Sequence, residues 1–116
     1  MMTQGHPKLD YVDLPTSYIL GVIYDDSSLT LEMDFHLLEG HPRYRQTDDP
    51  EGCFNKGFVA FKDLDDLRLR KAKVEEGQDR DLSIIEKAEI DGDYVYILGG
   101  WGEIELTAQT IQVAFD

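Results

Sequence analysis

The residues best suited to metal binding are few and widely spaced in this chain. The soft ligand types are three histidines and one cysteine, namely His6, His36, His41 and Cys53. None of them stands at the close paired spacing of a zinc site, such as Cys-x-x-Cys or His-x-x-x-His. His36 shares a predicted strand face with Glu32 and Asp34, but that is also the pattern of a solvated polar face. We therefore expect no metal site and no cofactor.

The patterns of nucleophilic and phosphoryl chemistry are also missing. Cys53 follows Gly52 in an acidic stretch, where neighbouring carboxylates disfavour a reactive thiolate. The chain has no G-x-S-x-G motif. The glycine-rich run at 99–102 has no helix after it, so it predicts a hairpin and not a phosphate loop. The acidic runs at 63–66 and 91–93 lack the full calcium-loop pattern. We predict a protein that is not an enzyme.

Aromatic and acidic residues near the C-terminus favour recognition instead of catalysis. The candidate binding residues are Tyr94, Tyr96, Trp101, Glu103 and Glu105. Aromatic rings dominate the energetics of many protein interfaces, and they accept cation–π contacts. Carboxylates between them would pair with Lys or Arg of a basic partner. A second sheet packed over the same side chains is the alternative interpretation, and the sequence leaves it open.

A long loop is the second candidate site. Residues 39–52 are rich in Gly, Pro, Asp and Arg, have no apolar period, and carry His41 and Tyr44 as candidate binding residues. Loops of this length are often functional. Binding of a small molecule or carbohydrate by this loop, at the mouth of a β-barrel, is therefore the alternative function.

The charge balance restricts the class of partner. Eleven Lys and Arg stand against 24 Asp and Glu, which gives a net charge of −13. Such a field repels nucleic acids and anionic lipids and attracts a basic protein, although acidity also simply aids solubility. The single cysteine and the absence of a signal-like apolar run lead us to expect a cytoplasmic protein. The sequence leaves open whether the chain forms a homo-oligomer.

Strands are expected to position the candidate aromatic residues. Turns at Asp91-Gly92, Gly99-Gly100 and Gln109-Thr110 would separate short strands and place Val95 opposite Ile104. One face is then apolar: Val95, Ile97, Ile104, Leu106, Ala108, Ile111, Val113 and Phe115. The other face carries the candidate aromatic and acidic residues together with Leu98 and Gln112, and with Ile85, Lys87 and Glu89 if residues 82–90 form the preceding strand.

A second hairpin is predicted nearer the N-terminus. Residues 17–25 and 29–37 show strand alternation around a four-residue loop at 25–28. The pairs would be Tyr24 with Leu29, Val22 with Leu31, Leu20 with Met33 and Tyr18 with Phe35, with Ile19 on the other face. Residues 53–61 predict a further strand. Residues 64–74 favour a strand after a turn at 62–63, with a short helix as the alternative.

These segments define one domain, 1–116, with 1–13 as a flexible arm. We predict an all-β fold: an antiparallel meander of about eight strands that forms a sandwich or an open barrel.

Three short motifs carry a family resemblance. They are Leu14-Pro15-x-Ser17-Tyr18, His41-Pro42-x-Tyr44 and Gly100-Trp101-Gly102. In this order they resemble a family of small acidic all-β bacterial proteins to which no function is assigned, although Gly100 stands where that family has Asp. The resemblance implies a bacterial, cytoplasmic, all-β protein. Our function hypothesis is a non-enzymatic protein-binding module, and analogy of size and charge suggests the immunity-protein type.

Overall fold

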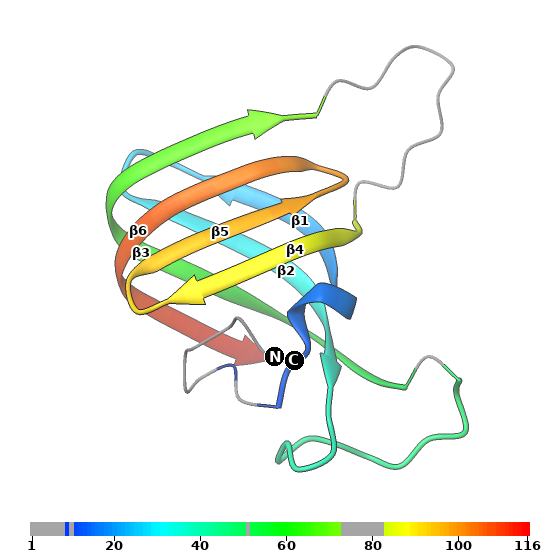
Figure 1. The fold of residues 1–116 in the computed structure, drawn as a ribbon. Coiled ribbons are helices and arrows are strands. Elements are labelled where there is room, and N and C mark those ends of the chain that lie inside the picture. The colour runs from blue at the N-terminus through cyan, green and yellow to red at the C-terminus, as the bar shows by residue number, and fades with distance from the viewer. Residues whose placement is uncertain (1–8, 10, 51, 73–82) are drawn as a thin grey trace.

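The fold is all-β and antiparallel, as the sequence predicts, and its strands form one sheet. The computed structural model describes residues 9, 11–50, 52–72 and 83–116, and Figure 1 shows their strands in the order β1-β2-β3-β6-β5-β4. The elements are the 3-10 helix η2 (Leu14–Thr16), β1 (Tyr18–Tyr24), β2 (Ser28–Leu37), β3 (Cys53–Lys71), β4 (Ile85–Asp91), β5 (Tyr94–Gly99) and β6 (Gly102–Phe115).

Two long strands replace four of the predicted short ones. Lys62 of β3 pairs with Thr110 of β6, so the predicted turns at 62–63 and 109–110 lie opposite each other within continuous strands. Asp63 has a φ of 56°, and the Thr110 hydroxyl donates a hydrogen bond to its Oδ2 at 3.3 Å. The chain bends here without reversing direction. The predictions of two turns at these positions, and of about eight strands, are therefore wrong, and the described strands number six.

The bends keep the apolar side chains on one side of the sheet. At the bend of β3, the side chains that face the core are Phe61 and then Leu64. At the bend of β6, they are Ala108 and then Ile111. A three-residue step at each bend shifts the alternation, as an irregularity in a strand does. The predicted apolar face is therefore correct although its third turn is not: six of its residues are buried, and Val113 and Phe115 pack partly buried against the core.

The curled sheet encloses this core on its concave side. Figure 1 shows β1 and β2 lying behind β4 and β5, with β3 and β6 curving between the two halves. The edge strands meet at one end, where Tyr18 bridges Ile84 and the Ile19 N–H donates to the Ser83 carbonyl at 2.8 Å. The architecture is thus an open sheet curled towards a barrel, and among the described residues no second sheet covers its convex face.

Part of the predicted N-terminal arm belongs to the fold. Leu9, Val12 and Leu14 are buried in the core, and Val12 forms a bridge with Leu37. The Asp13 N–H also donates to the His36 carbonyl at 2.9 Å. Residues 9 and 11–13 are therefore packed against the sheet, whereas the rest of the predicted arm lies outside the described residues.

The β1–β2 hairpin confirms half of its predicted register. Tyr24 pairs with Leu29 and Val22 with Leu31, as expected. A bulge between Ile19 and Gly21 then shifts the pairing, so that Ile19 pairs with Met33 and enters the core. The predictions that Leu20 faces Met33, that Tyr18 faces Phe35 and that Ile19 lies on the outer face are wrong, because the bulge inserts one extra residue into β1.

The β4–β5–β6 register differs from the prediction by two residues in each hairpin. Val95 pairs with Leu106 and not with Ile104, because Gly99 pairs with Gly102 around a Gly100-Trp101 turn. A two-residue difference leaves each side chain on its predicted face. Two predicted residues of the aromatic and acidic face are exceptions. Ile85 is buried because a bulge between Ile85 and Lys87 reverses the alternation at the start of β4. Trp101 lies in the β5–β6 turn and packs against the core.

Candidate functional site

The predicted aromatic and acidic side chains meet on the convex face of β5 and β6. The Tyr94 hydroxyl donates a hydrogen bond to Glu105 Oε2 at 2.7 Å, and the Tyr96 hydroxyl donates one to Glu103 Oε2 at 2.6 Å. Both bonds run diagonally, since the backbone of Tyr96 pairs with Glu105 and not with Glu103. Diagonal neighbours on one sheet face are within reach of such long side chains.

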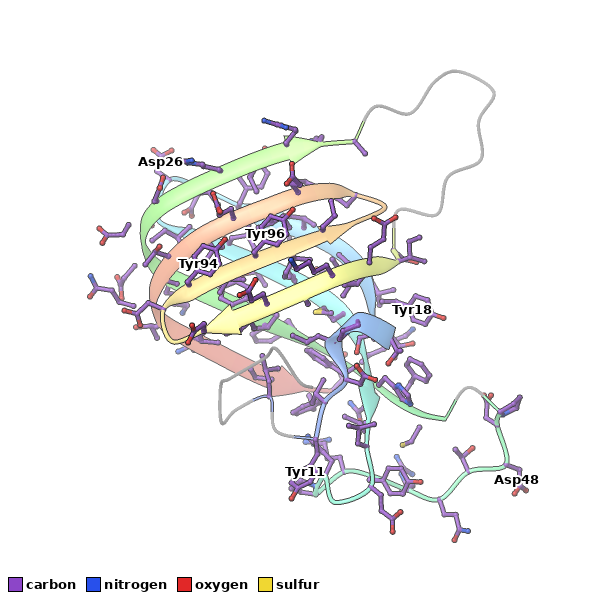
Figure 2. The ribbon with its side chains drawn as sticks, viewed as in Figure 1. Tyr11, Tyr18, Asp26, Asp48, Tyr94 and Tyr96 are labelled. Atoms are coloured by element: carbon purple, nitrogen blue, oxygen red, sulfur yellow. The ribbon has the colours of Figure 1, made fainter. Side chains whose placement is uncertain are left out.

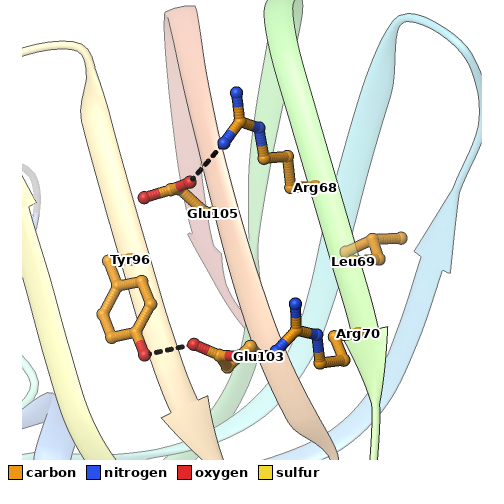
Figure 3. Close-up of a pocket in the computed structure, with 6 residues that line it drawn as sticks. All are labelled: Arg68, Leu69, Arg70, Tyr96, Glu103 and Glu105. Atoms are coloured by element: carbon orange, nitrogen blue, oxygen red, sulfur yellow. Dashed lines mark hydrogen bonds and ion pairs between the residues drawn. The ribbon is translucent and has the colours of Figure 1, made fainter.

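Two arginines of β3 extend this arrangement across the sheet. Arg68 lies 3.8 Å from Glu105 and Arg70 lies 3.6 Å from Glu103, measured between guanidinium nitrogen and carboxylate oxygen. We call the two rows the Tyr–Glu–Arg ladder, made of Tyr94–Glu105–Arg68 and Tyr96–Glu103–Arg70. All of these residues except Tyr94 are drawn in Figure 3. Each carboxylate therefore has both a hydroxyl donor and a cation.

The ladder residues other than Tyr94 line an open depression on the convex face. Its volume is about 270 Å³, and it is lined by Arg68, Leu69, Arg70, Tyr96, Glu103 and Glu105. Figure 3 shows the ladder side chains other than Tyr94, which project from β3, β5 and β6 on the same side of the sheet. The Arg68 and Arg70 side chains are 73% and 84% exposed, so their charged ends face solvent. The depression thus presents one aromatic ring and exposed ion pairs.

The hydrogen bonds of the ladder change the acidity of its tyrosines. The Glu105 carboxylate accepts a hydrogen bond from the Tyr94 hydroxyl and raises the pKa of Tyr94 from 10.0 to about 12. Glu103 raises the pKa of Tyr96 in the same way. Lys87 Nζ also lies 5.8 Å from the centroid of the Tyr96 ring, on the β4 side. Both hydroxyls are held protonated, so they act as donors and not as bases.

Trp101 lies apart from the ladder. It sits in the β5–β6 turn, half-buried against the edge of the core, and its carbonyl accepts the Ala72 N–H at 2.8 Å. Lys71 Nζ lies 5.9 Å from the centroid of the indole ring. The indole is therefore both a packing element and a partly accessible ring at one end of the sheet.

His41 and Tyr44 form a separate group at the C-terminal end of β6. The His41 ring packs edge-on against the Phe115 ring, with 5.0 Å between the two ring centroids. Arg43 lies over the same Phe115 ring, with its Cζ 5.5 Å from the ring centroid. Burial and the nearby Arg43 charge lower the pKa of His41. Tyr44 packs partly buried against the core. The loop borders an open depression of about 410 Å³ lined by polar residues such as Arg43, Arg45 and Asn55.

The metal-ligating residue types are engaged elsewhere. His36 Nδ1 lies 2.6 Å from the Thr16 hydroxyl, and its ring stacks on Phe54 at 4.9 Å. Cys53 is a half-buried free thiol. Within residues 9, 11–50, 52–72 and 83–116, no three His, Cys, Asp or Glu side chains converge as metal ligands.

Sequence reasoning missed the two arginines of the ladder. Arg68 and Arg70 alternate with Leu67 and Leu69, which is the signal of a strand with one polar face. That signal could have placed both arginines on a convex face. Their partners, however, follow from the pairing of β3 with β6, which no local pattern encodes.

Comparisons of the chain with models of known protein families, with curated proteins and with solved structures gave no match. The family resemblance carried by the short motifs therefore stays a prediction. In the described part of the chain, no helix has the length and apolar character needed to cross a membrane.

Proposed function

We propose that this protein is a non-enzymatic binding module that takes a basic protein partner on the convex face of β3, β5 and β6. The observation that carries the proposal is the position of the Tyr–Glu–Arg ladder on a face that no described residue covers. Tyr94 is 36% exposed, whereas its neighbour Val95 is buried. This supports recognition over the alternative of a second sheet packed on the same side chains.

The ladder is suited to exchange its partners on binding. Arg68 and Arg70 hold Glu105 and Glu103 through exposed ion pairs at 3.8 and 3.6 Å. Exposed pairs of this kind typically contribute only about 0–1 kcal/mol. A guanidinium or ammonium group of a partner could therefore replace either arginine at small cost, while Tyr96 supplies a rigid aromatic surface beside it.

An acidic rim next to the ladder would attract a basic partner. The β1–β2 turn, the bend of β3 and the β4–β5 turn lie at one end of the sheet, since the Leu64 N–H donates to the Ser27 carbonyl and the Ala108 N–H to the Asp93 carbonyl. These three segments carry Asp25, Asp26, Asp63, Asp65, Asp66, Asp91 and Asp93. Tyr94 pairs with Asp91 and Thr107 beside this rim. Complementary charge of this kind mainly raises association rates.

The alternative, binding of a small molecule, has less support inside the sheet. Phe35 and Phe61 are fully buried and fill the concave side together with the leucines of β2. The depression beside the 39–52 loop is open and lined by polar side chains, so it supports only a surface site around His41 and Tyr44. A cytoplasmic location and an immunity-like role remain parts of the proposal.

The proposal is tested by affinity purification from cells of the source organism at low and physiological salt. The baits are the wild type, the double variant Tyr94→Ala/Tyr96→Ala and the control Phe58→Ala. Phe58 is 38% exposed on an interior strand, so it matches Tyr94 in type and exposure. We expect a basic protein on the wild-type and control baits but not on the double variant. Equal recovery on all three baits would refute the proposed face.

A further inference from the structure

The edge strand β1 divides into a closed half and an open half. Tyr18 and Ile19 are connected to residues 83–84 of the opposite sheet edge. Beyond the bulge, Gly21 to Tyr24 pair with β2 and, among the described residues, with no other strand. In the strand order, β2 separates this open half from β3, the nearest strand of the ladder, and β2, β3 and β6 separate it from the tyrosines of β5 (Figure 1).

The open half is apolar and carries no charge. Ile23 and Tyr24 are 59% and 48% exposed, and the adjoining bulge residue Leu20 is 51% exposed, which is unusual for side chains of these types in one short strand. The other edge strand, β4, carries four charged residues among its seven, at positions 86, 87, 89 and 91. Charges on an edge strand prevent pairing with another chain. Edge β4 has this protection, and the open half of β1 lacks it.

The backbone of the open half presents hydrogen-bonding groups to a further strand. The Asp25 N–H donates to the Ser28 carbonyl at 2.9 Å. This bond determines which residues of β1 form backbone hydrogen bonds with β2. Bonded pairs alternate along an antiparallel ladder, so Ile23 and Gly21 bond to β2. The N–H and C=O groups of Val22 and Tyr24 then point away from β2, to the open edge.

A carboxylate lies over this edge at Gly21. Glu32 Oε2 is 3.1 Å from the position that a Cβ on Gly21 would occupy, so the missing side chain lets Glu32 reach across β1. Glu32 is exposed, and no described Lys or Arg lies within ion-pair distance of it. Its neighbour Asp34 differs, because Lys56 is close enough to act on its charge.

We propose that the open half of β1 accepts an extended segment of a partner protein as a seventh strand, with a Lys or Arg opposite Gly21 and an apolar residue opposite Ile23. The backbone groups of Val22 and Tyr24 pair with the segment, Ile23 packs against its apolar residue, and Glu32 pairs with its cation. This is strand addition to a sheet edge, in which main-chain bonds give affinity and side chains give specificity.

Charge decides between a partner segment and a second copy of this chain. Self-pairing of β1 would bring together two chains of net charge −13, with a Glu32 on each side of the junction and no cation in Tyr18–Tyr24. A basic segment instead neutralises Glu32. The site does not depend on the ladder, so either can fail without the other.

The test uses an acetylated and amidated peptide, Thr-Val-Thr-Lys-Val-Thr, and the same peptide with Glu in place of Lys. In antiparallel pairing its Val and Lys fall opposite Ile23 and Gly21. Amide NMR spectra of the full chain are followed during titration with each peptide. We expect saturable shifts at Val22 and Tyr24 with the Lys peptide, and at least tenfold weaker binding of the Glu peptide.

Three variants locate the contact. Tyr24→Pro removes an N–H that β2 does not use, at a position where an edge strand tolerates proline, and should abolish the shifts. Glu32→Gln changes only an exposed side chain and should abolish the preference for Lys. Tyr94→Ala should bind both peptides as the wild type does. Equal affinity for both peptides, shifts away from β1, or concentration-dependent shifts without peptide, which would indicate self-pairing, would each overturn the proposal.

Discussion

The Tyr96 hydroxyl lies 2.6 Å from Glu103 Oε2, although the backbone of Tyr96 pairs with Glu105. This diagonal bond, repeated by Tyr94 and Glu105, joins β5 to β6, and the arginines then join β6 to β3. The convex face therefore carries two rows of aromatic, acidic and basic groups. Figure 2 labels the two tyrosines, which lie two residues apart on β5.

The first prediction concerns alkaline pH. Because Glu105 raises the pKa of Tyr94 from 10.0 to about 12, the protonated hydroxyl stabilises the folded state. This contribution is complete below the unfolded pKa of 10.0 and is lost as the pH rises through about 12. We expect ¹³C NMR of the Tyr94 ring to titrate near 12 in the wild type and closer to 10.0 in Glu105→Gln. Identical titration in both proteins would show that the hydrogen bond does not form in solution.

The second prediction concerns the bend in β3. Asp63 has a φ of 56°, which glycine adopts freely and a β-branched residue does not. We expect Asp63→Gly to change the free energy of unfolding by less than about 0.5 kcal/mol, after loss of its exposed bond to Thr110. Asp63→Val should destabilise by about 1–3 kcal/mol through backbone strain. Urea unfolding of both variants checks this, and equal stability would mean that the bend is formed by other residues.

The third prediction separates packing from recognition at Trp101. The indole is half-buried against the core edge, so Trp101→Ala should cost about 1–3 kcal/mol of unfolding free energy. Phe61→Ala, at a fully buried position, should cost about 3–5 kcal/mol and provides the scale. Denaturant melts of the two variants measure both values. A loss at Trp101 as large as that at Phe61 would make the indole a core residue and remove it from the candidate site.

Local periodicity predicted the face of most side chains but not which strands pair. Val95, Ile97, Ile104 and Leu106 are buried as expected, since a two-residue error in each turn leaves the face unchanged. Bulges were the local features that alternation could not reveal, and they moved Ile19 and Ile85 into the core.

The bends and the ladder depend on contacts between residues distant in the sequence. Lys62 and Asp63 look like a turn because Asp tolerates a positive φ, and only the opposing bend at Thr110 makes them part of one strand. Arg68 and Glu105 likewise meet because β3 pairs with β6. The sequence therefore identified the tyrosines and glutamates of the candidate face but could not supply their arginines.

The fourth prediction concerns salt. If the acidic rim and the exposed pairs of the ladder attract the partner, its association rate should fall severalfold between about 50 and 200 mM NaCl, while its dissociation rate changes little. Stopped-flow or surface-based kinetics with the recovered partner measure both rates. A salt-independent association rate would contradict electrostatic attraction.

The central claim is tested most directly by calorimetric titration of the recovered basic partner into the wild type, Tyr94→Ala/Tyr96→Ala and Phe58→Ala. Interface hot spots typically contribute about 2 kcal/mol or more each, so we expect the double variant to bind at least about 100-fold more weakly. The Phe58→Ala control should stay within about threefold of the wild type. Equal affinity of the wild type and the double variant would contradict the assignment of the ladder as the binding face.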